Sequence, residues 1–314
     1  MKKYKNSKIF LAGHKGLVGS AIYNKLKSEG YKKIIVKNRK ELDLKDSKKV
    51  LNFLKKKKPE FLIIAAAKVG GIKANNDLSG QFIFENLSIQ NNLIDGAYRA
   101  GVKKLIFLGS SCIYPRSSKQ PIKEKYLMTG LLEKTNEAYA IAKIAGVKMC
   151  EYYNKQYSTN FISLMPCNTF GKNDNYDLDK SHFLPALIKK IYLAKIKKKK
   201  HVELWGNGKT LREAIYVDDI ADAVIHFLFT KTKHNLINIG TEKEMSIENY
   251  AKSIMKILRF KIRIKYVNKT LTGTPRKVLD CSIAKSYKWK PKYTIYEGLK
   301  KTLDDFEENY KKYN

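Results

Sequence analysis

Short apolar runs separated by longer amphipathic segments fill the first half of this 314-residue chain. The apolar runs occupy residues 8–13, 33–37, 61–67, 104–110 and 161–166, and segments with helical periodicity lie near 17–29, 46–56, 83–100 and 137–157. Short runs that are apolar at successive positions predict strands buried on both faces. Strands that alternate with helices predict an α/β class, with a doubly wound parallel sheet covered on both sides.

The alternation breaks at residue 171, where the polar stretch GKNDNYDLDKSH begins with glycine and predicts a loop. The pattern returns in residues 214–229 and 236–240. We therefore expect a larger domain of residues 1–170, to which residues 214–240 return. Residues 171–213 and 241–314 are expected to form a smaller C-terminal lobe over the carboxyl edge of the sheet, where open α/β sheets bind ligands.

A glycine-rich turn follows the first expected strand. Gly13, Gly16 and Gly19 have the spacing GxxGxxG at the start of the first expected helix. Glycines at these positions let the backbone approach a pyrophosphate, which then meets the positive end of the helix. In this strand–loop–helix context, the spacing predicts that residues 1–170 form a Rossmann domain that binds a dinucleotide.

The residues after the second expected strand distinguish NADP from NAD. Enzymes that use NAD place an acid about 20 residues beyond the glycines, where it binds the ribose 2′-hydroxyl. The stretch KIIVKNRKEL has its first acid only at Glu41. Arg39, together with Lys15, can form charge-assisted hydrogen bonds to a 2′-phosphate. We therefore expect NADP(H) as the cofactor.

Tyr139 and Lys143 are four residues apart and share one face of an expected helix. A phenol has a pKa of about 10, too high for easy proton exchange at neutral pH, and we expect the lysine ammonium to lower it. Ser110 follows the fourth expected strand and can bond the same substrate oxygen as Tyr139. The constellation predicts hydride transfer to a carbonyl group, with Tyr139 as the proton donor.

Composition excludes several other functions. The chain carries a formal net charge of +34, but its lysines are spread throughout and no nucleic-acid-binding motif accompanies them. We therefore expect a lysine-rich surface or an anionic substrate, and no nucleic-acid partner. No apolar run is long enough for a membrane helix. The 4 cysteines lack the spacing of a zinc site or a disulfide framework, which favours a cytoplasmic location and no metal.

Seven stretches of the chain resemble the extended short-chain dehydrogenases/reductases, and within them the enzymes that epimerise and reduce GDP-4-keto-6-deoxy sugars. These stretches are AGHKGLVGSAI, AAAKVGGIKANN, FLGSSCIYP, NEAYAIAKIAG, the Ser181-His182 pair, LWGNGKTLRE and GTPRKVLD. The resemblance implies C3/C5 epimerisation followed by reduction of the C4 ketone. It also implies a homodimer.

The resemblance gives roles to individual residues. Cys112 matches the base and His182 the acid of the epimerisation, while Ser110, Tyr139 and Lys143 would stabilise the enolate. The expected cofactor-binding residues are Gly13, His14, Lys15, Gly16, Leu17, Val18, Gly19, Arg39, Asp43, Leu44, Leu108, Gly109, Ser110, Ser111, Lys143, Pro166, Asn168, Thr169 and His182.

The resemblance also places the GDP-sugar against Asn168, Lys190, Trp205, Arg212 and Thr272. Lys190 stands where the family usually has arginine, and Thr272 replaces an acidic residue. These changes leave the identity of the sugar open, and two alternatives to the epimerase and reductase remain. One is an enzyme that only reduces a GDP-6-deoxy-4-keto-heptose for a surface polysaccharide. The other is a binding protein that senses NADP, although such proteins usually lose the Tyr or the Lys, and both are present here.

Overall fold

The expected parallel sheet is present in the computed structural model, which describes residues 4–178, 181–267 and 276–313. Within these residues, six parallel strands pair in the order β2-β1-β3-β4-β5-β9. Their bounds are β1 (Lys8–Ala12), β2 (Lys33–Ile35), β3 (Phe61–Ile64), β4 (Lys104–Leu108), β5 (Phe161–Pro166) and β9 (Leu236–Ile239). The doubly wound α/β fold class is therefore confirmed.

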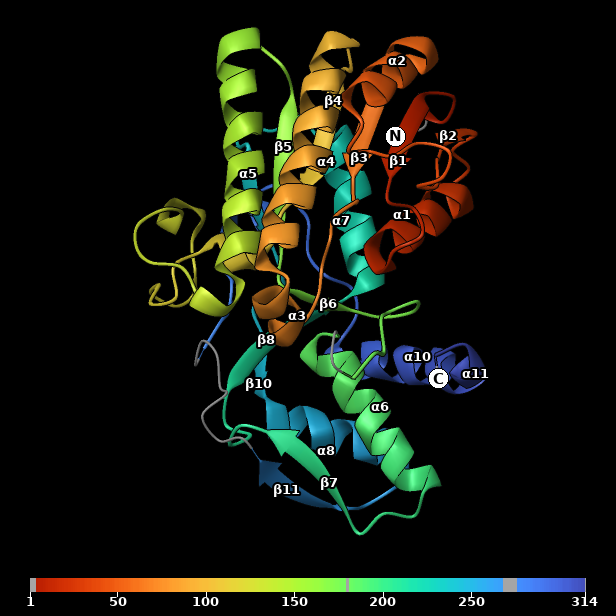
Figure 1. Cartoon of the computed structure of the whole chain (residues 1–314), viewed down its shortest axis with the longest axis vertical. Helices are drawn as coiled ribbons and strands as arrows, with labels where there is room; N and C mark the ends of the chain where they lie inside the picture. Colours follow the sequence, from red (N-terminus) through yellow and green to blue (C-terminus); the bar gives the residue numbers. More distant parts are fainter. Residues whose placement is uncertain (1–3, 179–180, 268–275, 314) are drawn as a thin grey trace.

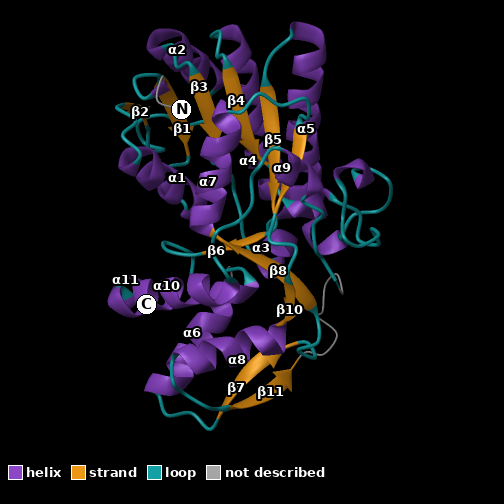
Figure 2. Ribbon diagram, turned by 180° about the vertical axis from the view of Figure 1, so that it is seen from behind, coloured by secondary structure: helices purple, strands orange, loops and turns teal. Residues whose placement is uncertain are grey.

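Helices cover both faces of this sheet. α2, α4 and α5 lie side by side over one face (Figure 1), and α1 packs against α7 over the other (Figure 2). α4 starts earlier than the periodicity predicted, because its first three residues are exposed and its buried face begins only at Phe82. The bounds are α1 (Leu17–Ser28), α2 (Ser47–Lys57), α3 (Ile72–Asp77), α4 (Ser79–Arg99), α5 (Glu137–Tyr157) and α7 (Val217–Phe229).

Most of the remaining elements lie beyond the carboxyl ends of the sheet's strands, in the lower part of Figure 1. β8 (Leu211–Tyr216) pairs with β6 (Asn168–Phe170) and β10 (Glu244–Ser246), while β7 (His201–Trp205) pairs with β11 (Arg263–Val267). The helices here are α6 (Phe183–Ile196), α8 (Ile247–Ile257), α10 (Ile295–Glu308) and α11 (Tyr310–Tyr313), and α9 (Ser282–Ser286) packs by β9.

The central strands form the core and fix the position of the residues that follow them. Every residue of β3 and β4 is buried, and burying each large aliphatic side chain contributes about 1.5–3 kcal/mol. β4 and β5 are parallel neighbours, so the segments after Leu108 and after Pro166 emerge at the same edge. Across the described ranges, no helix has the length and hydropathy needed to span a bilayer.

Candidate active site

The turn between β1 and α1 brings two stretches of backbone into contact. Gly13 has a φ of +92°, and a Cβ there would lie 2.5 Å from the backbone nitrogen of Ala66. A Cβ on Gly19 would clash with the carbonyl oxygen of Gly13. The N-cap residue of α1, Gly16, makes no side-chain cap. The N–H groups of the first turn and the helix dipole therefore suit a pyrophosphate, and the turn fits the predicted dinucleotide.

Two basic residues predicted to hold the 2′-phosphate lie in different turns, Lys15 after β1 and Arg39 after β2. Lys15 and Arg39 are exposed. Glu41, the first acid after β2, accepts hydrogen bonds from the backbone nitrogen of Asn38 (2.9 Å) and from Nζ of Lys37 (2.6 Å). Because this carboxylate is engaged within its own loop, the arrangement suits a 2′-phosphate better than a ribose hydroxyl that needs an acid.

The other residues predicted to hold the dinucleotide stand at the ends of β1, β2, β4 and β5 or in the segments that follow them. Asn92 of α4 donates a hydrogen bond to the carbonyl oxygen of Leu44 (3.0 Å), which ties the loop before α2 to that helix. A Cβ on Gly109 would clash with the side chain of Met165, so the chain after β4 passes close to β5. These residues are His14, Leu17, Val18, Asp43, Leu44, Leu108, Ser111, Pro166 and Thr169.

Ser110 and Tyr139 meet between the end of β4 and α5. Their side chains are hydrogen bonded to each other, and Oγ of Ser110 also accepts a hydrogen bond from the backbone nitrogen of Cys112 (3.2 Å). Burial, followed by the charge of Cys112, raises the pKa of Tyr139, and the Ser110 hydrogen bond only partly opposes that shift. Tyr139 therefore keeps its proton at neutral pH, as a general acid must before it reacts.

Lys143 contacts the backbone rather than the phenol. Its Nζ donates a hydrogen bond to the carbonyl oxygen of Leu108 (2.8 Å) and lies 5.8 Å from the centroid of the Tyr139 ring. Burial lowers the pKa of Lys143 to about 7. The expectation that this ammonium lowers the pKa of Tyr139 is wrong for the protein alone, because desolvation outweighs a charge held at that distance.

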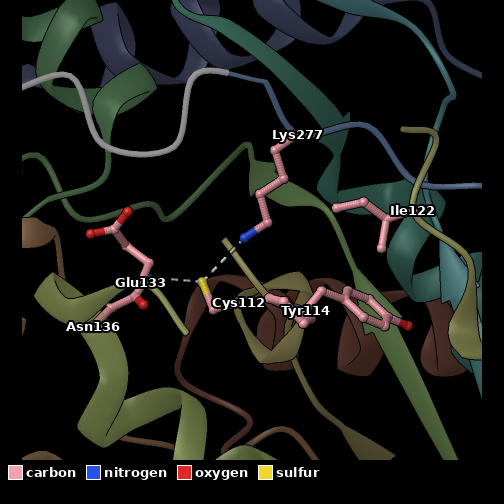
Figure 3. Close-up of a pocket in the computed structure, with 7 residues that line it drawn as sticks. Cys112, Tyr114, Ile122, Glu133, Asn136 and Lys277 are labelled. Carbon is pink, nitrogen blue, oxygen red and sulfur yellow. Dashed lines mark hydrogen bonds between the residues drawn. The ribbon is translucent and has the colours of Figure 1, made fainter. Parts of the chain in front are cut away.

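Cys112 lies in a small pocket beside this pair, and its sulfur accepts two hydrogen bonds (Figure 3). Asn136 donates through Nδ2 at 3.4 Å, and Lys277 donates through Nζ at 3.5 Å. The other three cysteines of the chain are buried, whereas Cys112 is only partly so. The rest of the pocket lining consists of Tyr114, Pro115, Ile122 and Glu133.

His182 lies at the N-cap of α6. The residue is exposed to solvent. Desolvation by the surrounding protein atoms lowers the pKa of His182, and the positive charge of Lys277 lowers it further. Lys277 is therefore within electrostatic range of both Cys112 and His182. The ammonium of Lys277 thus acts on both residues that are predicted to exchange protons with the sugar.

Two residues predicted to bind the substrate are paired on the lobe beyond the sheet. Nζ of Lys190, on α6, lies 4.9 Å from the ring centroid of Trp205, on β7, and donates a weak hydrogen bond to the carbonyl oxygen of Glu203 (3.4 Å). Trp205 remains 45% exposed, so part of its side chain is open to a ligand such as a planar base. Thr272 lies outside the described residues.

Of the other predicted substrate residues, Arg212 lies near Cys112, and Asn168 contacts the strand that carries Arg212. Arg212, on β8, is partly buried and interacts electrostatically with Cys112 and Glu133. Asn168, at the start of β6, donates a hydrogen bond to the backbone oxygen of Glu213 (2.7 Å). The structure thus brings Arg212 and Asn168 to the side of the site that faces the smaller lobe.

Three residues that the sequence analysis did not single out complete this arrangement. Asn136 and Lys277 contact the sulfur of Cys112, and Glu213, with no exposed surface, accepts hydrogen bonds from the backbone nitrogens of Thr241, Glu242 and Leu279. Asn136 and Lys277 lie in stretches that carry the family resemblance, but sequence spacing gives no signal that they meet Cys112.

Comparison with known proteins agrees with the fold and the site. The sequence profile described as the NAD dependent epimerase/dehydratase family matches residues 9–240. The chain is 47% identical over 304 residues to the GDP-L-fucose synthase of Sinorhizobium fredii, covering 96% of each chain. It is 46% identical over 305 residues to GDP-L-fucose synthase 1 of Arabidopsis thaliana, covering 97% of this chain and 94% of the relative.

A solved structure also matches almost throughout. The GDP-mannoheptose C4 reductase of Campylobacter jejuni with NADP bound superposes with a TM-score of 0.88 at 39% identity, covering 96% of this chain and 99% of that one. The profile match spans more than half of the residues, and the glycine turn and the Ser110–Tyr139–Lys143 constellation lie within it. This chain belongs to the NAD dependent epimerase/dehydratase family.

Proposed function

We propose that this protein is an NADPH-dependent epimerase and reductase of a GDP-4-keto-6-deoxy sugar, which produces GDP-L-fucose or a close analogue. The observation that carries the proposal is the convergence of Cys112 with Ser110 and Tyr139 at the end of β4. A group suited to removing a proton beside a ketone therefore lies next to groups suited to protonating the ketone oxygen. The identity of 47% to a GDP-L-fucose synthase over nearly the whole chain supports the same activity.

The residues along the carboxyl edge of the sheet would hold NADP(H). The glycine turn would receive the pyrophosphate, Lys15 and Arg39 the 2′-phosphate, and Lys143 a hydroxyl of the nicotinamide ribose. When bound, this cofactor supplies the hydride that reduces the C4 carbonyl group. Its identity as NADP is supported by the missing acid after β2 and by the NADP bound to the similar C. jejuni reductase.

The side chains divide the proton transfers between them. Cys112, as a thiolate, removes the proton at C3 or C5: the C–H bond breaks, an S–H bond forms, and the electron pair moves onto the C4 oxygen. Ser110 and Tyr139 stabilise that oxygen by hydrogen bonds. His182, as the imidazolium, returns a proton on the opposite face. In the reduction, Tyr139 donates its proton to the same oxygen.

We assign the GDP moiety to the lobe formed by residues 171–213 and 241–314, while residues 1–170 and 214–240 hold the cofactor. Trp205 can stack on guanine, and Arg212 can form paired hydrogen bonds with the diphosphate. Lys190 offers a point charge in place of the paired donors of an arginine. Asn168 lies near the sugar in this arrangement.

A reductase that does not epimerise is the second candidate. The observation that favours it is the match, at 39% identity, to the C. jejuni GDP-mannoheptose C4 reductase. The same Ser110, Tyr139 and Lys143 would serve a GDP-6-deoxy-4-keto-heptose, and Cys112 would then have no proton to remove. A protein that only senses NADP would have no use for a complete hydride-transfer constellation, so this reading is the weaker of the alternatives.

One experiment separates these candidates. The protein is incubated with GDP-4-keto-6-deoxy-mannose and NADPH in deuterated water, and the products are analysed by mass spectrometry and NMR. We expect NADPH oxidation and deuterium at C3 and C5. NADPH oxidation without deuterium would identify a reductase alone, and binding of NADPH without any turnover of this ketone or of the heptose analogue would identify a binding protein.

Replacing Arg39 with alanine tests the cofactor. Losing charge-assisted hydrogen bonds worth about 1.5–3 kcal/mol should weaken NADPH binding about 10–100-fold. NADH binding should change little, because NADH lacks the 2′-phosphate. Lys40→Ala, which removes a neighbouring exposed charge, is the matched control. Equal efficiency of the unmodified protein with NADPH and NADH would contradict the proposed preference.

We also propose a homodimer built on α4 and α5. Ile141 and Tyr152 of α5 are 43% and 57% exposed and point within about 20° of each other on an ideal helix. Phe84, on the neighbouring helix α4, is 65% exposed. A stripe of large apolar side chains across two packed helices favours burial against its own copy.

Light scattering after gel filtration tests this assembly. We expect twice the mass of one chain for the unmodified protein, and a single-chain mass for the Ile141→Glu, Tyr152→Glu double variant. Leu131→Glu, which changes an exposed leucine outside these helices, should leave the dimer intact. A single-chain mass for the unmodified protein would rule this interface out.

We further propose a cytoplasmic location, which the free cysteines and the need for NADPH support.

A further inference from the structure

We infer that Lys277 holds the sulfur of Cys112 as a thiolate, and that Glu213 fixes Lys277 in the position from which it does so. The inference rests on the proposed function, because it explains how Cys112 can act as the base of the epimerisation. It assigns Lys277 as a positioning and charge-setting residue of that base.

The contacts of the sulfur favour the anionic form. Both neighbours that bond Sγ of Cys112 are donors: the amide of Asn136 at 3.4 Å and the ammonium of Lys277 at 3.5 Å. A thiolate only accepts hydrogen bonds, whereas a thiol also carries an S–H group, a weak donor that needs an acceptor. An ammonium within ~4–6 Å of an ionisable group typically moves its titration by ~1–3 pH units toward the charged form.

The other charges around Cys112 leave this effect in place. Arg212 adds a second positive charge within electrostatic range of the sulfur. Glu133, which lines the same pocket, is the opposing charge, but its carboxylate pairs with Nε of Arg116 at 3.3 Å and also interacts with Arg212. Tyr139 stays neutral because its pKa is raised by burial. Among the described residues, the named charges near the sulfur therefore sum to a positive value.

Lys277 is held in place through its backbone. Glu213 donates its backbone N–H to the carbonyl oxygen of Lys277 (3.4 Å), and its carboxylate accepts a hydrogen bond from the backbone nitrogen of Leu279 (2.8 Å). On the other side, Val278 bonds the loop at residues 120–122 in both directions, at 2.9 and 2.8 Å. With the segment fixed on both sides, the backbone that carries Lys277 is already ordered, so no further backbone entropy is lost when its Nζ bonds the sulfur.

The same ammonium also acts on the acid. The charge of Lys277 contributes to the lowered pKa of His182. One cation thus favours the proton-accepting form of Cys112 and makes the imidazolium of His182 a stronger proton donor. The same charge therefore favours the deprotonated form of both groups, the thiolate of Cys112 and the neutral imidazole of His182.

The test is the pH dependence of alkylation of Cys112 by iodoacetamide, measured by mass spectrometry on the full chain without substrate or cofactor. We expect the unmodified protein to show a midpoint below that of a free thiol, about 8.5. Lys277→Met should move the midpoint up by about 1–3 units and slow alkylation at pH 7 by about tenfold or more, whereas Lys277→Arg should retain a low midpoint. The Cys112→Ser variant measures how much alkylation of the buried cysteines contributes to the signal.

Lys123→Met is the matched control, because Lys123 pairs with Asp280 in the same segment at 3.9 Å rather than with the sulfur. It should leave the midpoint unchanged. An unmodified protein with a midpoint at or above 8.5, or a folded Lys277→Met variant with an unchanged midpoint, overturns the inference. If circular dichroism shows that Lys277→Met does not fold, the alkylation midpoints of Lys277→Gln and of the unmodified protein decide whether the inference holds.

The outcomes also separate this inference from the proposed function. Unchanged alkylation together with a higher KM for the GDP-sugar would make Lys277 a substrate ligand instead, and would overturn the inference. A shifted midpoint in a protein that incorporates no deuterium would leave the charge coupling standing and remove the epimerase activity.

Discussion

Phenylalanine at position 139 is expected to lower the turnover of C4 reduction by about 10²–10⁴-fold, the range typical of losing a general acid. The phenol of Tyr139 is hydrogen bonded to Ser110, and the aromatic ring stays in place when only the hydroxyl is removed. NADPH binding should therefore be retained, because the change affects an interaction made with the reacting oxygen in the transition state. Single-turnover oxidation of NADPH, with binding measured separately by fluorescence, gives both quantities.

Tyr153→Phe is the matched control for this change. Tyr153 lies on the same helix and donates its hydroxyl to Asp95 (3.0 Å), away from Ser110. Its variant should keep nearly full turnover. A Tyr139→Phe variant with more than about a tenth of the original turnover would exclude Tyr139 as the proton donor, since general acid catalysis contributes at least ~10²-fold.

Serine at position 112 is expected to abolish deuterium exchange at C3 and C5 while hydride transfer survives. An alcohol is a far weaker acid than a thiol, so at neutral pH the serine is almost never the alkoxide that could remove a proton. Ser110, Tyr139 and Lys143 are unchanged, and the product should be the unepimerised 4-hydroxy sugar. Deuterium at C3 and C5, measured with the 4-keto substrate present, is the deciding quantity.

His182→Gln provides the contrast. It should permit some proton removal by Cys112 but return protons poorly to the opposite face, so exchange persists while epimerised product falls. If Cys112→Ser incorporates as much deuterium as the unmodified protein, another group is the base. If the unmodified protein incorporates none, the enzyme is a reductase alone and Cys112 is a packing residue.

Much of the fold follows from local patterns. Runs such as FLII and LIFL, apolar at every position, predict strands buried on both faces, and they lie in β3 and β4 of the parallel sheet. The glycine spacing after β1 predicted a close approach of backbone segments, which Gly13 and Gly19 make. The absence of an acid between the second strand and Glu41 can likewise be seen in the sequence, because it depends only on which residues follow that strand.

Tertiary structure decided the environment of each reactive group. The contact between Lys277 and Cys112 joins residues 165 positions apart and depends on a segment that Glu213 holds. Lys143 was expected to stabilise the Tyr139 phenolate, yet it bonds the carbonyl oxygen of Leu108 in a buried site that raises the phenol pKa. The physical reason is the same in each case. Periodicity and turn chemistry act between near neighbours in sequence, whereas desolvation and charge coupling depend on which distant segments pack together.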